Sequence, residues 1–132
     1  MDLTLIKVNK LKKEILLTSA KRTAIFIRNK EIKELKGSKF SLGGMRTGDK
    51  HFEELVLNYQ EDDILYMFTD GYADQFGGEK GKKFSTKRLK ELLLNVHKLP
   101  ISEQKEVISN TISHWMNTQE QVDDILITGI KF

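Results

Sequence analysis

The chain of 132 residues is about the length of one domain, and its 39% hydrophobic and 31% charged residues are typical of a folded protein. It contains no cysteine, which excludes disulfides, thiolate zinc sites and a cysteine nucleophile. Its apolar runs are too short for a transmembrane helix, and the first ten residues hold no apolar segment of signal-peptide length. We therefore expect a cytoplasmic chain that makes no membrane contact.

The net charge of +3 conceals an uneven distribution. Residues 1–50 carry 13 Lys and Arg against 5 Asp and Glu, whereas residues 51–132 carry 9 against 14. A basic half can bind a polyanion. These lysines, however, are scattered singly between apolar residues, as on the solvent face of a strand. We favour a solvated face and expect no nucleic-acid partner.

The first third of the chain is predicted to form strands. Apolar residues alternate approximately with polar ones, and the connections are only a few residues long, which favours antiparallel hairpins. The predicted strands are residues 2–9, Glu14–Ala20, Thr23–Asn29 and Glu31–Lys36. Residues 37–51 contain four glycines and no clear period, so we expect a loop there.

Two more strands are predicted at Glu53–Asn58 and Ile64–Thr69, and then the period changes to that of helices. One helix precedes Pro100 and is capped by Ser85 or Thr86, and a second begins with Ser102 as its N-cap. A final strand covers Ile125–Phe132. Strands followed by two helices and a strand predict the α+β class, with mainly antiparallel sheet and two helices near the C-terminus.

The first acidic candidate is Asp70, in the segment FTDGYADQFGG at the end of an apolar strand. Asp-Gly is a common hairpin-turn pair, which is one interpretation. The residues that follow are too rich in glycine and polar side chains for a good strand, so a functional carboxylate is the other. If a helical turn follows Gly71, then Asp74 lies on the same side as Asp70.

The second acidic candidate is the pair Asp123 and Asp124, in QVDDILITGI just before the last strand. Adjacent carboxylates repel one another unless a positive group is near. They are either solvated charges at an exposed edge or ligands of a cation. Carboxylates from two neighbouring strand ends would suit a hard ion such as Mg²⁺ or Mn²⁺.

Together these segments resemble a known family. DILYMFTDGYADQFGG, GKKF, HWMN and QVDDILITGIKF resemble the C-terminal portion of bacterial PPM-type serine/threonine phosphatase domains, most closely those of stage II sporulation protein E (SpoIIE). The opening MDLTLIKVN, the segment ILLTSAKRTAIFIRNKEIKELK and FSLGG resemble the middle strands of that family. The resemblance covers nearly the whole chain, and its most specific feature is a TDG motif followed about fifty residues later by a DD pair.

The resemblance implies two packed antiparallel sheets flanked by helices, with a site for two Mn²⁺ or Mg²⁺ ions. It implies that Asp70 and Asp123 are metal ligands, and that Gly71, Asp74 and Asp124 lie at the edge of the site. The implied reaction is hydrolysis of a phosphoserine or phosphothreonine monoester by a metal-activated water. No other catalytic residue is implied, and the substrates are phosphorylated proteins, often in sigma-factor regulation.

One departure from the family concerns the start of the chain. Members begin with an Asp-Gly motif whose carboxylates help to bridge the metals, and nothing similar occurs here before Leu3. We therefore expect residues 1–132 to be a single domain region, the C-terminal part of a SpoIIE-like phosphatase domain, and inactive alone. The alternative is a catalytically dead, phosphatase-like module that binds a protein. Uncovered sheet edges would favour a homodimer.

Overall fold

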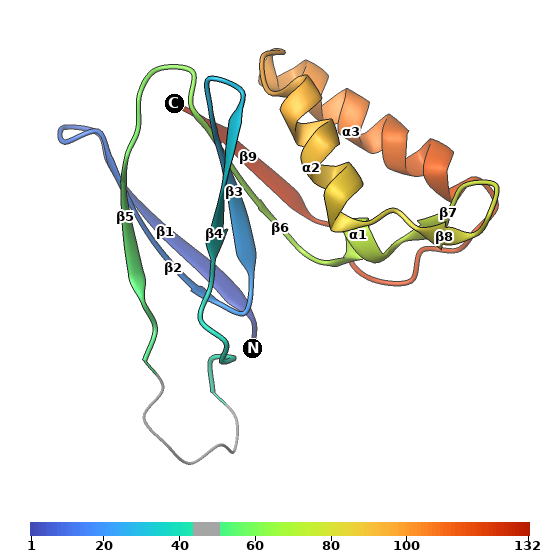
Figure 1. The fold of residues 1–132 in the computed structure, drawn as a ribbon, viewed down its shortest axis with the longest axis horizontal. Helices are drawn as coiled ribbons and strands as arrows, with labels where there is room; N and C mark the ends of the chain where they lie inside the picture. Colours follow the sequence, from blue (N-terminus) through green and yellow to red (C-terminus); the bar gives the residue numbers. More distant parts are fainter. Residues whose placement is uncertain (44–50) are drawn as a thin grey trace.

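The described residues form two larger antiparallel sheets and a small two-stranded one, with helices packed against one of the larger sheets (Figure 1). The computed structural model describes residues 1–43 and 51–132. Sheet A has the order β1 (Leu3–Asn9), β2 (Glu14–Ala20) and β5 (Glu54–Asn58). Sheet B has the order β4 (Glu31–Lys36), β3 (Thr23–Arg28), β6 (Ile64–Phe68) and β9 (Ile127–Lys131). The predicted α+β class is confirmed, and the ends of these strands lie within two residues of those predicted.

The space between the two sheets holds one half of the core. Along β2 the side chains alternate, so that Ile15 and Leu17 are buried on the face toward sheet B. There they pack with Ala24, Phe26 and Leu65 of the central strands of sheet B. The period of two in the sequence thus gives β2 one buried face and one outer face.

The other face of sheet B packs against helices α2 (Thr86–Val96) and α3 (Ile101–Met116). Ile25 and Tyr66 of the sheet meet Leu89 and Leu93 of α2 and Ile112 of α3 in this second cluster. Strands β3 and β6 are therefore apolar on both faces, as the run ILYMF predicts. Sheet B is the middle of three layers.

The chain passes from sheet A to sheet B at Lys21 and Arg22, where the short connection predicted a hairpin. That prediction is wrong, because β2 and β3 lie in different sheets. The physical reason is burial: β3 has apolar residues on both faces and takes a central place in sheet B, whereas β2 buries only one face. Lys21 adopts a positive φ of 60° at this corner.

The segment after β6 departs from the prediction in two ways. A helical turn, α1 (Gly71–Asp74), follows the strand, so Asp70-Gly71 does not form a hairpin turn. The glycine-rich residues that we considered unsuitable for a strand form a small hairpin of β7 (Phe76–Gly77) and β8 (Lys82–Lys83). Gly78 and Gly81 supply the positive φ angles that its connection needs.

The helix boundaries partly agree with the prediction. Ser85 caps α2 as predicted, because its hydroxyl accepts a hydrogen bond from the Arg88 amide at 3.4 Å. Ser102 is not the N-cap of α3, since the helix begins at Ile101 with Pro100 at the cap position. A proline has no N–H to leave unsatisfied there, so it both ends one segment and starts the next.

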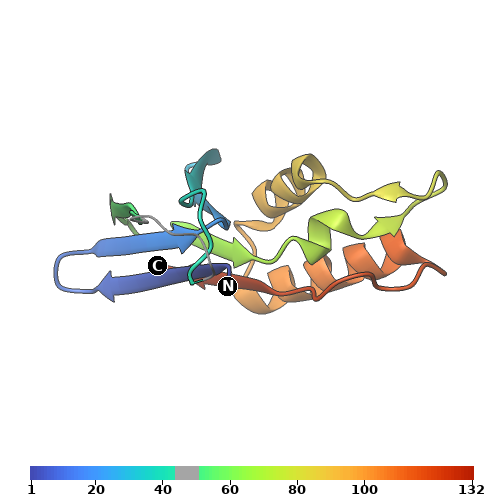
Figure 2. The ribbon, with the colours of Figure 1, turned by 90° about the horizontal axis from the view of Figure 1, so that it is seen from below.

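The outer face of sheet A is not covered by any described element. The β1–β2 hairpin extends away from the helices (Figure 2). Leu5 is 59% exposed and Val56 is 54% exposed, and Val56 pairs with the partly buried Leu16. This apolar stripe, with the edges of β1 and β5 beside it, lies open on the outer side of sheet A.

Candidate metal centre

Sheet pairing brings the two acidic segments to one place. Asp70 lies just beyond the C-terminal end of β6, and Asp123 and Asp124 lie just before the start of β9. These strands are antiparallel neighbours, with Phe68 opposite Ile127. The end of one strand and the start of the other therefore coincide, although they are about sixty residues apart in the sequence.

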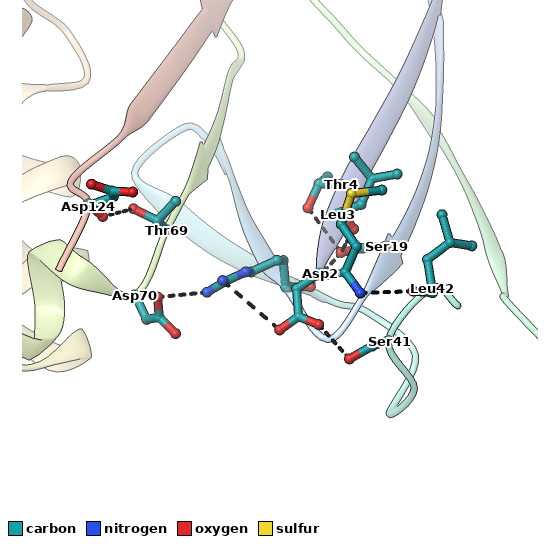
Figure 3. Close-up of polar contacts among 11 residues, drawn as sticks. Asp2, Leu3, Thr4, Ser19, Ser41, Leu42, Thr69, Asp70 and Asp124 are labelled. Atoms are coloured by element: carbon teal, nitrogen blue, oxygen red, sulfur yellow. Dashed lines mark hydrogen bonds and ion pairs between the residues drawn. The ribbon is translucent and has the colours of Figure 1, made fainter. Parts of the chain in front are cut away.

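Thr69 fastens the two segments together (Figure 3). Its hydroxyl donates to the Asp124 carbonyl at 2.7 Å and accepts from the Leu126 amide at 3.0 Å. Its own amide donates to the Leu126 carbonyl at 3.0 Å. Side chain and backbone of one residue thus hold the acidic pair beside the end of β6.

Gly71 allows the closest approach between the segments. A Cβ atom at this position would lie 2.3 Å from the Asp124 carbonyl oxygen and 2.9 Å from its carbon. Real Cβ atoms essentially never come within 3.0 Å of such atoms. Glycine is therefore required here by the backbone of Asp124 passing over it, and not by an unusual φ angle.

The Asp70 side chain is 57% exposed, and its carboxylate binds a cation from the chain itself. The Arg22 guanidinium lies 2.8 Å from Asp70 Oδ1, and a second nitrogen of Arg22 lies 4.0 Å from Asp2 (Figure 3). Asp2 accepts a hydrogen bond from the Ser41 hydroxyl at 2.6 Å, which lowers the pKa of Asp2. Asp70 is the N-cap residue of α1, yet its side chain makes no capping bond.

Asp74 lies one turn after Asp70, and its amide donates to the Asp70 carbonyl at 2.9 Å. Its carboxylate pairs with Lys83 at 3.1 Å. Both acidic residues line a cleft of about 220 Å³, together with Lys21, Arg22 and Lys90. Asp70 and Asp74 therefore face the same space, as a helical turn after Gly71 predicts.

Asp123 and Asp124 are exposed. The Asp123 carboxylate accepts a hydrogen bond from the Asp124 amide at 2.7 Å, and the Asp123 carbonyl accepts one from Gln121 at 2.8 Å. Of the four candidate aspartates, only Asp70 and Asp74 line the cleft. The acidic pair lies against Gly71 at its side.

Gln75 is a positioning residue that the sequence did not reveal. Its side chain is fully buried and donates to the Glu120 carbonyl at 2.8 Å while accepting from the Val122 amide at 3.3 Å. Gln75 thereby holds the chain that leads into Asp123. The sequence offered no signal for this role, because a glutamine in a polar, glycine-rich segment is ordinarily exposed.

The residues at this end of the fold fit part of a divalent-metal site. The carboxylates of Asp70 and Asp123 are hard oxygen donors, and Arg22 already stands as a cation against Asp70. Within residues 1–43 and 51–132, no group of three or more His, Asp or Glu side chains could hold a metal ion. Asp70 and Asp123 are therefore candidate donors for a ligand set that the described residues do not complete.

A groove of about 320 Å³ lies between α3 and β9, away from this end of the fold, and is lined largely by Ile and Tyr side chains. It holds none of the acidic candidates and adds no donor to the acidic site.

In the part of the chain that the structure describes, no helix is long and apolar enough to cross a membrane.

Comparisons with known proteins place these observations in a family. The family model of stage II sporulation protein E (SpoIIE) matches residues 1–132. A search of curated proteins gives no significant match.

Several solved structures are similar to this chain. The PP2C domain of SiaA from Pseudomonas aeruginosa is 27% identical with a TM-score of 0.90, and the match covers 99% of this chain and 51% of that one. The SpoIIE phosphatase domain of Bacillus subtilis is 13% identical with a TM-score of 0.71, covering 99% and 56%. The serine/threonine phosphatase PstP/Ppp of Mycobacterium tuberculosis is 12% identical with a TM-score of 0.60, covering 97% and 57%. The chain thus spans about half the length of these structures and has the PPM phosphatase fold.

Proposed function

Because this chain belongs to the stage II sporulation protein E (SpoIIE) family, we propose that it is the C-terminal part of a metal-dependent protein serine/threonine phosphatase domain. The observation that carries the proposal is the convergence of the two acidic segments. Thr69 bonds to Asp124, and Gly71 leaves room for the Asp124 backbone, so Asp70 and Asp123 come to one end of sheet B.

In this proposal Asp70 and Asp123 are ligands of Mn²⁺ or Mg²⁺. Bound divalent cations supply an activated water and neutralise charge on the phosphoryl group. Asp74 and Asp124 lie at the edge of the site, where Asp74 pairs with Lys83 and the carbonyl of Asp124 accepts a hydrogen bond from Thr69. The substrate is a phosphoserine or phosphothreonine side chain of a protein, in a cytoplasmic signalling pathway such as sigma-factor regulation.

The proposal extends to what this chain does alone. The described residues supply too few ligands for a two-metal site, so in this proposal residues 1–132 by themselves bind divalent metal weakly and do not turn over substrate. The apolar stripe of the exposed Leu5 and Val56 and the partly buried Leu16, with the edges of sheet A, favours self-association as a two-fold dimer.

The test uses the longer parent protein with a phosphoserine protein or an aryl phosphate at saturating Mn²⁺. Asp70→Asn and Asp123→Asn each remove a charged ligand and are expected to lower turnover by orders of magnitude. Asp62→Asn is the matched control, because Asp62 is 78% exposed and pairs with Lys131 at the far end of sheet B. Unchanged turnover in either site variant would refute the assignment.

The alternative is a catalytically dead module that binds a protein, and the lack of any metal-holding group of three or more His, Asp or Glu side chains in the described residues favours it for this chain in isolation. The gene of the parent separates the two functions. An Asp-Gly motif upstream of these residues, together with Mn²⁺-dependent turnover, supports the enzyme. A parent without that motif and without turnover supports the binding module.

A further inference from the structure

The corner where the chain passes from sheet A to sheet B places two adjacent cations at the acidic cleft. Lys21 and Arg22 both line it. The backbone of this corner is well fixed, because the Arg22 carbonyl accepts from the Ser19 hydroxyl at 2.8 Å and from the Gly37 amide at 3.1 Å. The Lys21 amide donates to the Ser38 carbonyl at 2.8 Å. The two long side chains therefore project from a rigid base.

The charges around the cleft are paired in a particular way. Lys90 lies 2.6 Å from Glu34, which lowers the pKa of Glu34, and Asp74 lies 3.1 Å from Lys83. The Lys21 ammonium makes no ion pair within the described residues. Arg22 pairs with Asp70, the residue that we propose as a metal ligand.

We propose that Lys21 and Arg22 form a binding subsite for the phosphate dianion of a phosphorylated side chain, an inference that rests on the proposed phosphatase function. While the Asp70 carboxylate is not neutralised by another cation, it pairs with the Arg22 guanidinium and repels an anion. When that charge is neutralised, the guanidinium loses its 2.8 Å partner, keeps its 4.0 Å contact with Asp2, and can take phosphate oxygens with two parallel N–H bonds. Lys21 adds a second positive charge from the neighbouring position.

The geometry gives Arg22 this role rather than a structural one. Its side chain is 26% exposed and reaches across from the sheet corner to α1, yet it bonds to no backbone group there. The structural arginine of this fold is Arg28, which bonds to the buried Asp63 and to the Asn58 carbonyl. Arg22 instead contacts the exposed Asp70 carboxylate at the cleft and, at 4.0 Å, the Asp2 carboxylate.

The experiment removes the negative charge at Asp70 without adding a metal. Inorganic phosphate is titrated into the chain of 132 residues, without divalent ions, and binding is followed by backbone amide shifts in NMR spectra. Asp70→Asn is expected to bind phosphate roughly tenfold more tightly than the unsubstituted chain, because a charge-assisted hydrogen bond becomes available. In Asp70→Asn with Arg22→Gln, that gain is expected to disappear. Asp70→Asn with Lys12→Gln is the matched control and is expected to keep it, since Lys12 lies at the opposite end of sheet A.

A second variant at position 70 tests whether the asparagine still contacts Arg22. Asp70→Ala removes the amide oxygen that asparagine would still offer to Arg22, and it is expected to give the same gain. Folding of each variant is checked by the dispersion of the same spectra. The shifts are expected at Lys21 and Arg22, and O-phosphoserine is expected to reproduce them whereas serine does not.

Two results would overturn the subsite. One is phosphate binding that does not tighten in either Asp70 variant, and the other is tightened binding that survives Arg22→Gln. Both leave the proposed function standing, because that function is tested by turnover of the parent. Conversely, unchanged turnover of the parent with Asp70→Asn would refute the proposed phosphatase function. The phosphate titration would still measure binding at Lys21 and Arg22.

Discussion

Substitution of Gly71 by alanine tests whether the contact between the two acidic segments forms the site. The added methyl group would meet the Asp124 carbonyl oxygen at 2.3 Å, where ordinary contacts begin at 3.4 Å, so the Asp124 backbone must retreat by about 1 Å. Overpacking of this kind costs about 1–3 kcal/mol of the free energy of unfolding. Alanine is the better helix former by about 1 kcal/mol, which offsets part of the loss in α1. We expect a net destabilisation of up to about 2 kcal/mol.

Stability alone does not separate a clash at the site from a clash elsewhere, so Gly77→Ala is the matched control. Its Cβ would lie 1.8 Å from the Trp115 carbonyl oxygen and would not meet the Asp124 backbone. Urea unfolding measures the stability of both variants, and Mn²⁺ binding to the parent, followed by electron paramagnetic resonance of the free ion, measures the site. Both variants should be destabilised, and only Gly71→Ala should weaken Mn²⁺ binding. A Gly71→Ala protein with unchanged stability and unchanged Mn²⁺ affinity would refute the reasoning.

Two further predictions concern pH and self-association. Burial raises the pKa of Tyr66 and of Tyr72, whose hydroxyls donate to Gln104 and to the Ile108 carbonyl. Above pH ~10 the unfolded chain therefore loses phenolic protons that the folded chain keeps, and the free energy of unfolding falls by about 1.4 kcal/mol per pH unit for each tyrosine. This stability is complete below pH ~10, and urea unfolding at a series of alkaline pH values should show a shallower fall in Tyr72→Phe; equal slopes would contradict the assignment. For self-association, light scattering of residues 1–132 over a concentration series should show a dimer, and Val56→Lys on the apolar stripe should weaken it, whereas a strictly monomeric chain at all concentrations would count against the exposed edges.

Periodicity made most of the fold predictable from the sequence. The alternation in Glu14–Ala20 and the unbroken apolar run of Ile64–Phe68 report directly how many faces of a strand are buried. The crossing at Lys21 and Arg22 could not be predicted in the same way, because a two-residue connection suits a hairpin unless the next strand needs burial on both faces. Which strands share a sheet is decided by the whole core.

The candidate site shows the same division. Asp70 and Asp123 were found because acidic residues beside apolar strands, in a spacing that resembles a family, are a local signal. Gln75 and Thr69 gave no such signal, since their partners Glu120 and Asp124 are 45 and 55 residues away. The cation that faces Asp70 was equally hidden, because Arg22 comes from a sheet corner that the sequence did not reveal.

The pairing of β6 with β9 has a consequence for when the site exists. Closing a loop of about sixty residues costs roughly 3–4 kcal/mol of chain entropy, and β9 borders only β6, so it joins sheet B late and leaves it early. During synthesis the TDG segment is complete long before the strand that carries the acidic pair leaves the ribosome. A nascent chain therefore presents Asp70 to Arg22 without its partner carboxylate. The cleft gains its acidic neighbour only when the last strand docks.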